Sequence, residues 1–178
     1  MLLKVGCACP PIYGDPGLLI SKYYKPKKVN KKFDLGIIPH FSEYEKVADL
    51  YQEYTNILVI NMASGNVEKT IDEIVSCSNT VSSSLHGIVF SHSYSIPVRW
   101  IKFSHQVFGD DTKFYDYFRA VGRPVETYID GLVFRKIDPE TILNEILDYK
   151  ISIDFHRLEE SLFFNSDGLK KSTLWKNL

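Results

Sequence analysis

The sequence predicts an α/β fold, a Rossmann-like, doubly wound sheet that is mostly parallel. Two observations lead to this prediction. Short apolar segments alternate along the chain with amphipathic segments of helical periodicity. The apolar segments are continuous, as in parallel strands that are buried on both faces. A chain of 178 residues is long enough for one such domain, which would bury about 70% of the surface of the unfolded chain.

Strands are expected where β-branched and other apolar residues run together, and helices where apolar residues recur every three or four positions. One helix start is especially clear, because Asp138, Pro139 and Glu140 supply a cap, a proline at the first helical position and an acid that suits the helix dipole. The expected strands cover residues 33–39, 56–62, 80–82, 97–103 and 132–135, and the expected helices cover 42–54, 67–75, 85–95, 112–121 and the segment after Asp138.

Three regions are expected. Residues 1–30 form an irregular N-terminal segment, residues 31–150 form the Rossmann-like domain, and residues 151–178 form a helical tail that packs on this domain or on a partner. Five lysines between residues 25 and 32 have two interpretations, a solvated connector or a patch that faces an anionic ligand or a membrane surface.

Composition excludes several classes of protein. The 21 basic and 22 acidic residues give a net charge of −1, which argues against a nucleic-acid partner. No apolar stretch reaches the roughly 18 to 20 residues that cross a bilayer, and the first residues lack the apolar core of a signal peptide. Three cysteines, Cys7, Cys9 and Cys77, suit small buried side chains in a reducing compartment, and their spacing predicts no metal site. A cytoplasmic location is the expectation.

The segment VSSSLHGIVFS, residues 81–91, is the most informative for function. A strand runs into three serines and then into an apolar helix, which Ser83 or Ser84 could cap. Free N–H groups in the first turn of that helix would attract a phosphate or carboxylate, with His86 beside it. Gly87 leaves room for a ligand or for the neighbouring strand. The alternative is that His86 packs inside a tight turn.

A second histidine, His40, follows the first predicted strand. Because the carboxyl ends of parallel strands meet at one edge of the sheet, His40 and His86 are expected to face the same cleft. His92 is expected to be a core residue, and His105 and His156 receive no role. The loop of residues 104–112 is either solvated or a mobile lid that offers Asp110 or Lys113 to a substrate. The zinc motif HExxH, phosphate-binding glycine loops and the GxSxG serine elbow are absent from the sequence.

Four segments together resemble the polysaccharide pyruvyl transferase family, in order from about residue 5 to residue 125. They are YGDPGLLISKYYKP, LGIIPHF, IDEIVSCSNTVSSSLHGIVFSHSYSIPVRWIKF and KFYDYFRAVGR. The resemblance implies one half of a fold that is similar to the two-domain glycosyltransferases of the B type. It also implies transfer of the carboxyvinyl unit of phosphoenolpyruvate onto two hydroxyls of a sugar, which gives a pyruvate ketal and phosphate. The setting would be exopolysaccharide or cell-wall polymer synthesis.

The resemblance places His86 at the phosphoenolpyruvate site, as phosphate ligand and proton donor. His40 is the candidate acid or base on the acceptor side. The expected substrate contacts are Ser83, Ser84, Leu85, Gly87, Asp110 and Lys113. Ser84 stands where related members can carry arginine, so no guanidinium contact with phosphate is expected there.

The implied partners are phosphoenolpyruvate and a sugar or lipid-linked oligosaccharide, with peripheral membrane association and no cofactor besides the donor substrate. The chain looks like the carboxyl half of the family's fold, so a second copy or a separate N-terminal half is a further expected partner. Two alternatives stay open: a glycosyltransferase that uses a nucleotide sugar, and a catalytically incomplete binding or assembly module.

Overall fold

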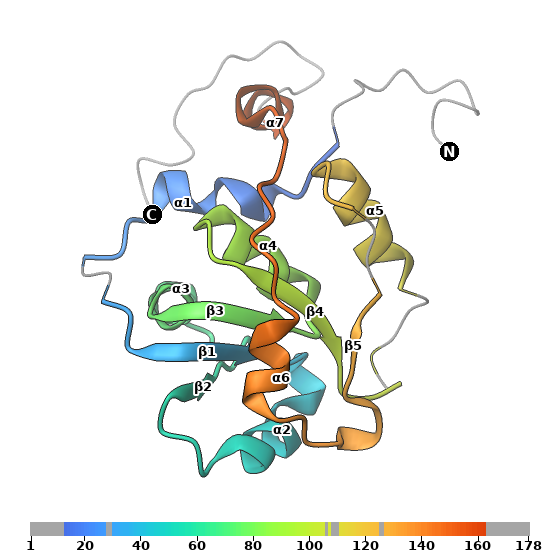
Figure 1. The fold of residues 1–178 in the computed structure, drawn as a ribbon. Coiled ribbons are helices and arrows are strands. Elements are labelled where there is room, and N and C mark those ends of the chain that lie inside the picture. Colours follow the sequence, from blue (N-terminus) through green and yellow to red (C-terminus); the bar gives the residue numbers. More distant parts are fainter. Residues whose placement is uncertain (1–12, 28–29, 106, 108–110, 125–126, 163–178) are drawn as a thin grey trace.

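The computed structural model of the protein describes residues 13–27, 30–105, 107, 111–124 and 127–162 (Figure 1). Within them lies a five-stranded sheet of order β2-β1-β3-β4-β5. Every neighbouring pair of strands is parallel, so the predicted α/β, Rossmann-like sheet is confirmed. The strands are β1 (Phe33–Ile38), β2 (Ile57–Val59), β3 (Cys77–Ser82), β4 (Val98–Lys102) and β5 (Ile129–Asp130).

Helices connect these strands, and local capping defines where several of them begin. Asn66 accepts a hydrogen bond from the Lys69 N–H at 2.9 Å, and Asp138 accepts from the two N–H groups that follow Pro139, as its sequence predicts. The α-helices are α1 (Ile20–Tyr23), α2 (Tyr44–Tyr51), α3 (Val67–Val75), α4 (Leu85–Ser93), α5 (Thr112–Ala120), α6 (Pro139–Asn144) and α7 (Phe155–Leu162); the 3-10 turns are η2 (Pro16–Leu19), η3 (Phe41–Glu43) and η4 (Leu132–Phe134).

The helices cover both faces of the sheet (Figure 1). Alternate residues of the strands face opposite sides of the sheet: Trp100 packs with α4 and α5, whereas Ile101 packs with α2 and α6. The sheet order explains this arrangement. The chain winds outward from β1 to β2 and then crosses back past β1 to β3, and right-handed crossovers in opposite directions place their helices on opposite faces.

The segment before β1 also contributes to the core. Leu18 and Leu19 in η2 are buried, and they join the apolar cluster of α4 and α5. Leu158 of α7 belongs to the same cluster. Glu159 of α7 accepts hydrogen bonds from Lys22 at 2.5 Å and from the Tyr23 hydroxyl at 2.7 Å, which ties α7 to α1.

One predicted strand is wrong. Residues 132–135 form the 3-10 turn η4 instead, and the last strand lies a few residues earlier at Ile129–Asp130. Val133 and Phe134 have φ values of 60° and 54°, which no strand residue adopts. The predicted helical tail is described only as far as Leu162, where α7 ends. None of the helices in the described residues is long and apolar enough to span a bilayer.

Candidate functional site

The candidate site lies where β1 and β3 end side by side. Ile38 and Ser82, their last residues, are paired in the sheet. The chain then leaves β1 toward α2 on one face and leaves β3 toward α4 on the other. In open parallel sheets this point of divergence forms a crevice in which ligands bind. The two segments that the sequence singles out, around His40 and His86, begin at these two strand ends.

The turn from β3 into α4 is held against β1 by Ser82. Its hydroxyl lies 2.7 Å from the Ile38 carbonyl oxygen and accepts a hydrogen bond from the Ser84 N–H at 3.0 Å. Gly87 is buried in this packing. A Cβ atom at Gly87 would lie 2.3 Å from the Ser82 hydroxyl oxygen and 2.7 Å from Ile38 Cγ2. Of the two interpretations of Gly87, the structure therefore favours the close approach of the neighbouring strand.

The expected serine cap on α4 is wrong. Ser84 occupies the N-cap position, but its side chain makes no capping hydrogen bond, because the Ser82 hydroxyl organises the turn. The Ser83 hydroxyl points away from α4 and donates to Glu43. The first N–H groups of α4 thus have no side-chain cap, and an anion could accept from them.

His86 projects from the first turn of α4 with 61% of its side chain exposed. Its ring lies 5.9 Å from the Phe90 ring, and its Nε2 atom lies 3.8 Å from Asp15 Oδ2. The other Asp15 oxygen accepts from the Gly17 N–H at 2.8 Å, which fixes this carboxylate at the start of η2. The imidazole of His86 is thus accessible and stands beside a carboxylate that pairs with it when the ring is protonated.

A buried carboxylate connects three strand ends. Glu43, at the end of η3, has no exposed surface. It accepts hydrogen bonds from the Ser83 hydroxyl at 2.6 Å and from the Ser104 hydroxyl at 2.5 Å, the serines that follow β3 and β4. Ser83 also accepts from the backbone N–H of His40 at 2.9 Å. Because all three elements meet at Glu43, this network sets the spacing of the segments that line the crevice.

His40 is half-buried, and its surroundings favour a neutral ring. Burial lowers the pKa of His40, the nearby Lys113 charge lowers it further, and Glu43 opposes both effects. The Ser42 N–H donates to Nδ1 of His40 at 3.4 Å, and the Ser42 hydroxyl lies 2.8 Å from the same atom. Since Nδ1 accepts, the neutral ring carries its proton on Nε2. His40 is therefore suited to donating a hydrogen bond through Nε2.

Lys113 lines both a groove and a smaller cavity at this edge of the sheet. An open groove of about 680 Å³ is lined by Asp15, Leu85, Lys113, Asp116 and Arg119 among others. A smaller cavity of about 70 Å³ lies on its other side. Lys113 thus reaches both, whereas Asp110, the other residue predicted from this loop, lies outside the described residues. The neighbouring Asp111 pairs with Lys102.

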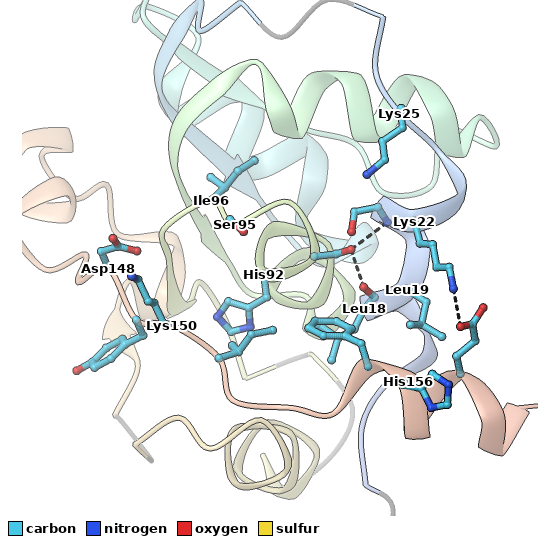
Figure 2. Close-up of a pocket in the computed structure, with 16 residues that line it drawn as sticks. Leu18, Leu19, Lys22, Lys25, His92, Ser95, Ile96, Asp148, Lys150 and His156 are labelled. Atoms are coloured by element: carbon cyan, nitrogen blue, oxygen red, sulfur yellow. Dashed lines mark hydrogen bonds and ion pairs between the residues drawn. The ribbon is translucent and has the colours of Figure 1, made fainter.

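A cavity of about 810 Å³ lies at the other edge of the sheet (Figure 2). Figure 2 shows His92 at its centre, with Lys22 and His156 on one side and Asp148 and Lys150 on the other. These residues come from α1, from the end of α4, from residues 148–151 and from α7. The cavity contains neither His40 nor His86, so it is a separate feature.

His92 is a core residue, as predicted. Its Nε2 atom lies 2.9 Å from an Arg123 nitrogen, and its Nδ1 atom lies 2.7 Å from the Tyr117 hydroxyl. Because arginine only donates, Nε2 accepts and the Nδ1–H donates to Tyr117. Burial, and next the Arg123 charge, lower the pKa of His92 to about 3. The ring is therefore neutral at physiological pH.

The described residues contain no group of three or more His, Cys, Asp or Glu side chains that could hold a metal ion. Cys77 is a buried free thiol, and burial raises its pKa to about 11. Cys7 and Cys9 lie outside the described residues.

Sequence reasoning missed Glu43, Ser104, Lys102 and Asp111. Glu43 stands three residues after His40, at the start of the helix that the sequence predicts over residues 42–54. Its burial depends on serines that lie 40 and 61 residues further along the chain. No local sequence pattern indicates that Glu43 is buried by these serines. Its position three residues after His40 is the one signal in the sequence that could have pointed to Glu43.

The fold defines an α/β protein of the Rossmann-like class, and its topological switch point, where sheets of this class bind ligands, lies at the ends of β1 and β3. The polysaccharide pyruvyl transferase family model matches residues 1–105, more than half of the chain. The chain belongs to this family. The matched residues include His40 and His86.

The chain is also similar to "Uncharacterized protein L143" of Acanthamoeba polyphaga mimivirus, with 35% identity over 119 residues. The match covers 65% of this chain and 42% of the viral protein, so the chain spans less than half the length of this relative. The search of solved structures found no significant match.

Proposed function

We propose that this protein acts as a polysaccharide pyruvyl transferase, which transfers a pyruvyl ketal from phosphoenolpyruvate to a sugar in exopolysaccharide or cell-wall polymer synthesis. One observation carries the proposal. His86 stands exposed at the uncapped start of α4, at the switch point of the sheet, within the segment that the family model matches. An imidazole beside free N–H groups can bind a phosphate or carboxylate.

The reaction has simple chemical requirements. Two sugar hydroxyls add to C2 of phosphoenolpyruvate, so two C–O bonds form while the bond from C2 to the phosphate oxygen breaks. One hydroxyl proton ends on C3, which becomes a methyl group, and the other leaves with phosphate. The site therefore has to bind the phosphate, protonate C3, stabilise an oxocarbenium-like centre and accept hydroxyl protons.

Residues at the crevice can be assigned to these requirements. His86 and the first N–H groups of α4 bind the phosphate, and protonated His86 supplies a proton. Lys113, on the wall of the open groove with Leu85, adds positive charge near the leaving group. His40 donates a hydrogen bond from Nε2 to the acceptor or to the pyruvyl oxygen atoms, because its Nδ1 is occupied by Ser42.

The proposal also includes the setting of the reaction. The acceptor is a sugar or lipid-linked oligosaccharide that the protein meets in the cytoplasm or at the membrane surface. No metal or further cofactor takes part. A second copy of the chain, or a separate N-terminal half, completes the wall of the crevice opposite α4 and α5.

The test is phosphate release by the full chain from phosphoenolpyruvate in the presence of methyl glycosides of common hexoses. We expect release with at least one glycoside, and His86→Ala should lower kcat/KM by about 10²- to 10⁴-fold. His156→Ala is the matched control, since His156 is also exposed but lies on α7. Equal rates for His86→Ala and the wild type would contradict the role of His86.

Thermal-shift titration separates the proposed reaction from the alternatives. Phosphoenolpyruvate should raise the melting temperature, and the rise should grow as its concentration exceeds the dissociation constant. A response to a nucleoside diphosphate and none to phosphoenolpyruvate would instead indicate a glycosyltransferase that uses a nucleotide sugar. A chain that responds to neither would be a binding or assembly module.

A further inference from the structure

The open groove of about 680 Å³ extends from the crevice along α5. Because α4 and α5 follow the parallel strands β3 and β4, both helices start at the edge of the sheet that holds the crevice. Leu85 and Lys113, in the first turns of these helices, line the groove at that edge, and Ala120, the last residue of α5, also lines it. Lys113 and Ala120 are about 10 Å apart along the helix axis. The groove is therefore longer than one pyranose ring.

The walls of the groove are held in place by the fold. Tyr117 of α5 is buried beneath it, and the Tyr117 hydroxyl lies 2.7 Å from Nδ1 of His92. The opposite wall is the chain that enters η2, which passes the last turn of α5 (Figure 1). Asp15 in this wall accepts a hydrogen bond from the Gly17 N–H, and the buried Leu18 anchors it to the core. A preformed groove of this kind lowers the entropy cost of binding.

Asp15 also connects the groove with His86. One oxygen of its carboxylate lies 3.8 Å from His86 Nε2, and Asp15 lines the groove together with Leu85, the neighbour of His86 in the chain. A ligand in the groove therefore has one end beside the imidazole to which the proposed function assigns the phosphate. An acceptor with more than one sugar unit can react at the crevice and extend along α5.

The accessible side chains of the groove suit a sugar ring. Tyr13 lines it with 60% of its surface exposed, and an aromatic ring can pack against the C–H groups on one face of a pyranose. Asp116 and Arg119 also line it, lie 3.8 Å apart and have side chains that are 69% and 68% exposed. The carboxylate accepts hydrogen bonds and the guanidinium donates them, so together they can bind neighbouring hydroxyls.

The charges of the groove favour a neutral ligand away from the crevice. Two carboxylates, Asp15 and Asp116, and two cations, Lys113 and Arg119, line it. Lys113 stands in the first turn of α5, at the crevice end, where its charge attracts the phosphate of the proposed reaction. On the following turns Asp116 and Arg119 offset each other. A neutral ring with several hydroxyls therefore matches this part of the groove better than a second anion, which Asp116 would repel.

We propose that the groove between α5 and the start of η2 binds the second sugar ring of an oligosaccharide acceptor. Tyr13 packs against this ring, and Asp116 and Arg119 bind its hydroxyls. The terminal ring, which receives the ketal, lies in the crevice beside His86. This inference rests on the proposed function and deepens it, because it makes the acceptor an oligosaccharide rather than a single sugar.

The test compares acceptors that differ by one ring. The full chain is assayed for phosphate release from phosphoenolpyruvate with matched methyl glycosides: glucose and cellobiose, galactose and lactose, mannose and mannobiose, N-acetylglucosamine and chitobiose. For the sugar that the protein uses, the disaccharide should have a kcat/KM about threefold to tenfold above that of the monosaccharide, mainly through a lower KM. Equal kcat/KM values within every pair would overturn the inference.

Variants of Tyr13 identify the groove as the cause. Tyr13→Ala should raise the KM for the disaccharide about threefold to tenfold relative to the KM for the monosaccharide, whereas Tyr13→Phe keeps the ring and should keep the wild-type ratio. Tyr23→Ala is the matched control, since it removes an exposed tyrosine from α1 and should not change the ratio. A Tyr13→Ala variant that loses the same factor with both acceptors would contradict a second-ring site.

Calorimetric titration of the disaccharides without phosphoenolpyruvate separates this inference from the proposed function. Disaccharide binding that Tyr13→Ala weakens, with no phosphate release from any acceptor, would leave the second-ring site standing and would refute the reaction. Phosphate release with no preference for disaccharides, and with an unchanged KM ratio in Tyr13→Ala, would support the reaction and refute the second-ring site.

Discussion

The Ser83 hydroxyl donates a 2.6 Å hydrogen bond to Oε2 of the fully buried Glu43. Ser104 donates to the other carboxylate oxygen, and Ser83 accepts from the His40 N–H. The ends of β1, β3 and β4 are thus connected through one side chain. A buried charge of this kind is stable only while its hydrogen-bond partners stay in place, so Glu43 couples the stability of the fold to the shape of the crevice.

Replacing Glu43 should therefore destabilise the protein. Glu43→Ala leaves two buried hydroxyls without their acceptor and creates a void, and we expect a loss of about 2–4 kcal/mol in the free energy of unfolding. Glu43→Gln keeps the volume and one acceptor oxygen, so its loss should be smaller. Urea denaturation measures both. Glu45→Ala, an exposed change one residue into α2, should stay within about 0.5 kcal/mol of the wild type, and an equal loss in all three variants would contradict this account.

The charge of Lys113 should be visible in the titration of His40. Lys113 lowers the pKa of His40, so Lys113→Met, which removes a positive charge, should raise that pKa toward the ordinary value. Histidine C–H signals followed by NMR as a function of pH measure the change. Lys150→Met removes the same charge at the opposite edge of the sheet and should leave the His40 titration in place. A downward shift in Lys113→Met would contradict the geometry.

The close packing of α4 on the sheet predicts a steric effect. Gly87→Ala would bring a methyl group within 2.3 Å of the Ser82 hydroxyl, which is fixed between Ile38 and Ser84. We expect a loss of about 2–3 kcal/mol of stability, because neither strand nor helix can move without breaking these hydrogen bonds. Ser84→Ala in the same turn is the control: its side chain caps nothing, and its stability should match the wild type in thermal unfolding.

Acid should destabilise the protein through His92. Its pKa is about 3 in the folded chain and about 6.5 in an unfolded one, so the unfolded state binds the extra proton first. Above about pH 6.5 the ring is neutral in both states, so its titration does not change the stability; below that pH, stability falls by up to about 1.4 kcal/mol per pH unit, or roughly 3 kcal/mol by pH 4.5. Urea midpoints between pH 8 and pH 4.5 measure this fall. His92→Gln should be less stable at pH 8 but should have a flatter pH profile.

The sequence predicts the sheet well where the apolar segments are long. The strands near residues 33–38 and 98–102 are rich in apolar residues, and the helices between them carry clear periodicity. The predicted position of the last strand is wrong for a physical reason. Ile129–Asp130 is too short to leave a pattern, whereas the apolar run at residues 132–135 is bent into a turn by positive φ values at Val133 and Phe134.

The sequence predicts only those parts of the candidate site that depend on neighbouring residues in the chain. The histidines follow recognisable strand ends, so their common edge can be inferred from the sequence of elements alone. The Glu43 network and the smaller cavity beside Lys113 arise from side chains that come together across the sheet. The same holds for the Asp15 carboxylate, which lies 3.8 Å from His86 although 71 positions separate them along the chain.

Both outer strands of the sheet are very short. β2 has three residues and β5 has two, and each pairs with its inner neighbour over that length. A foreign strand that approached either border would meet only a few backbone donors and acceptors in extended conformation. Brief borders of this kind are one way in which proteins discourage unwanted strand addition and fibril growth.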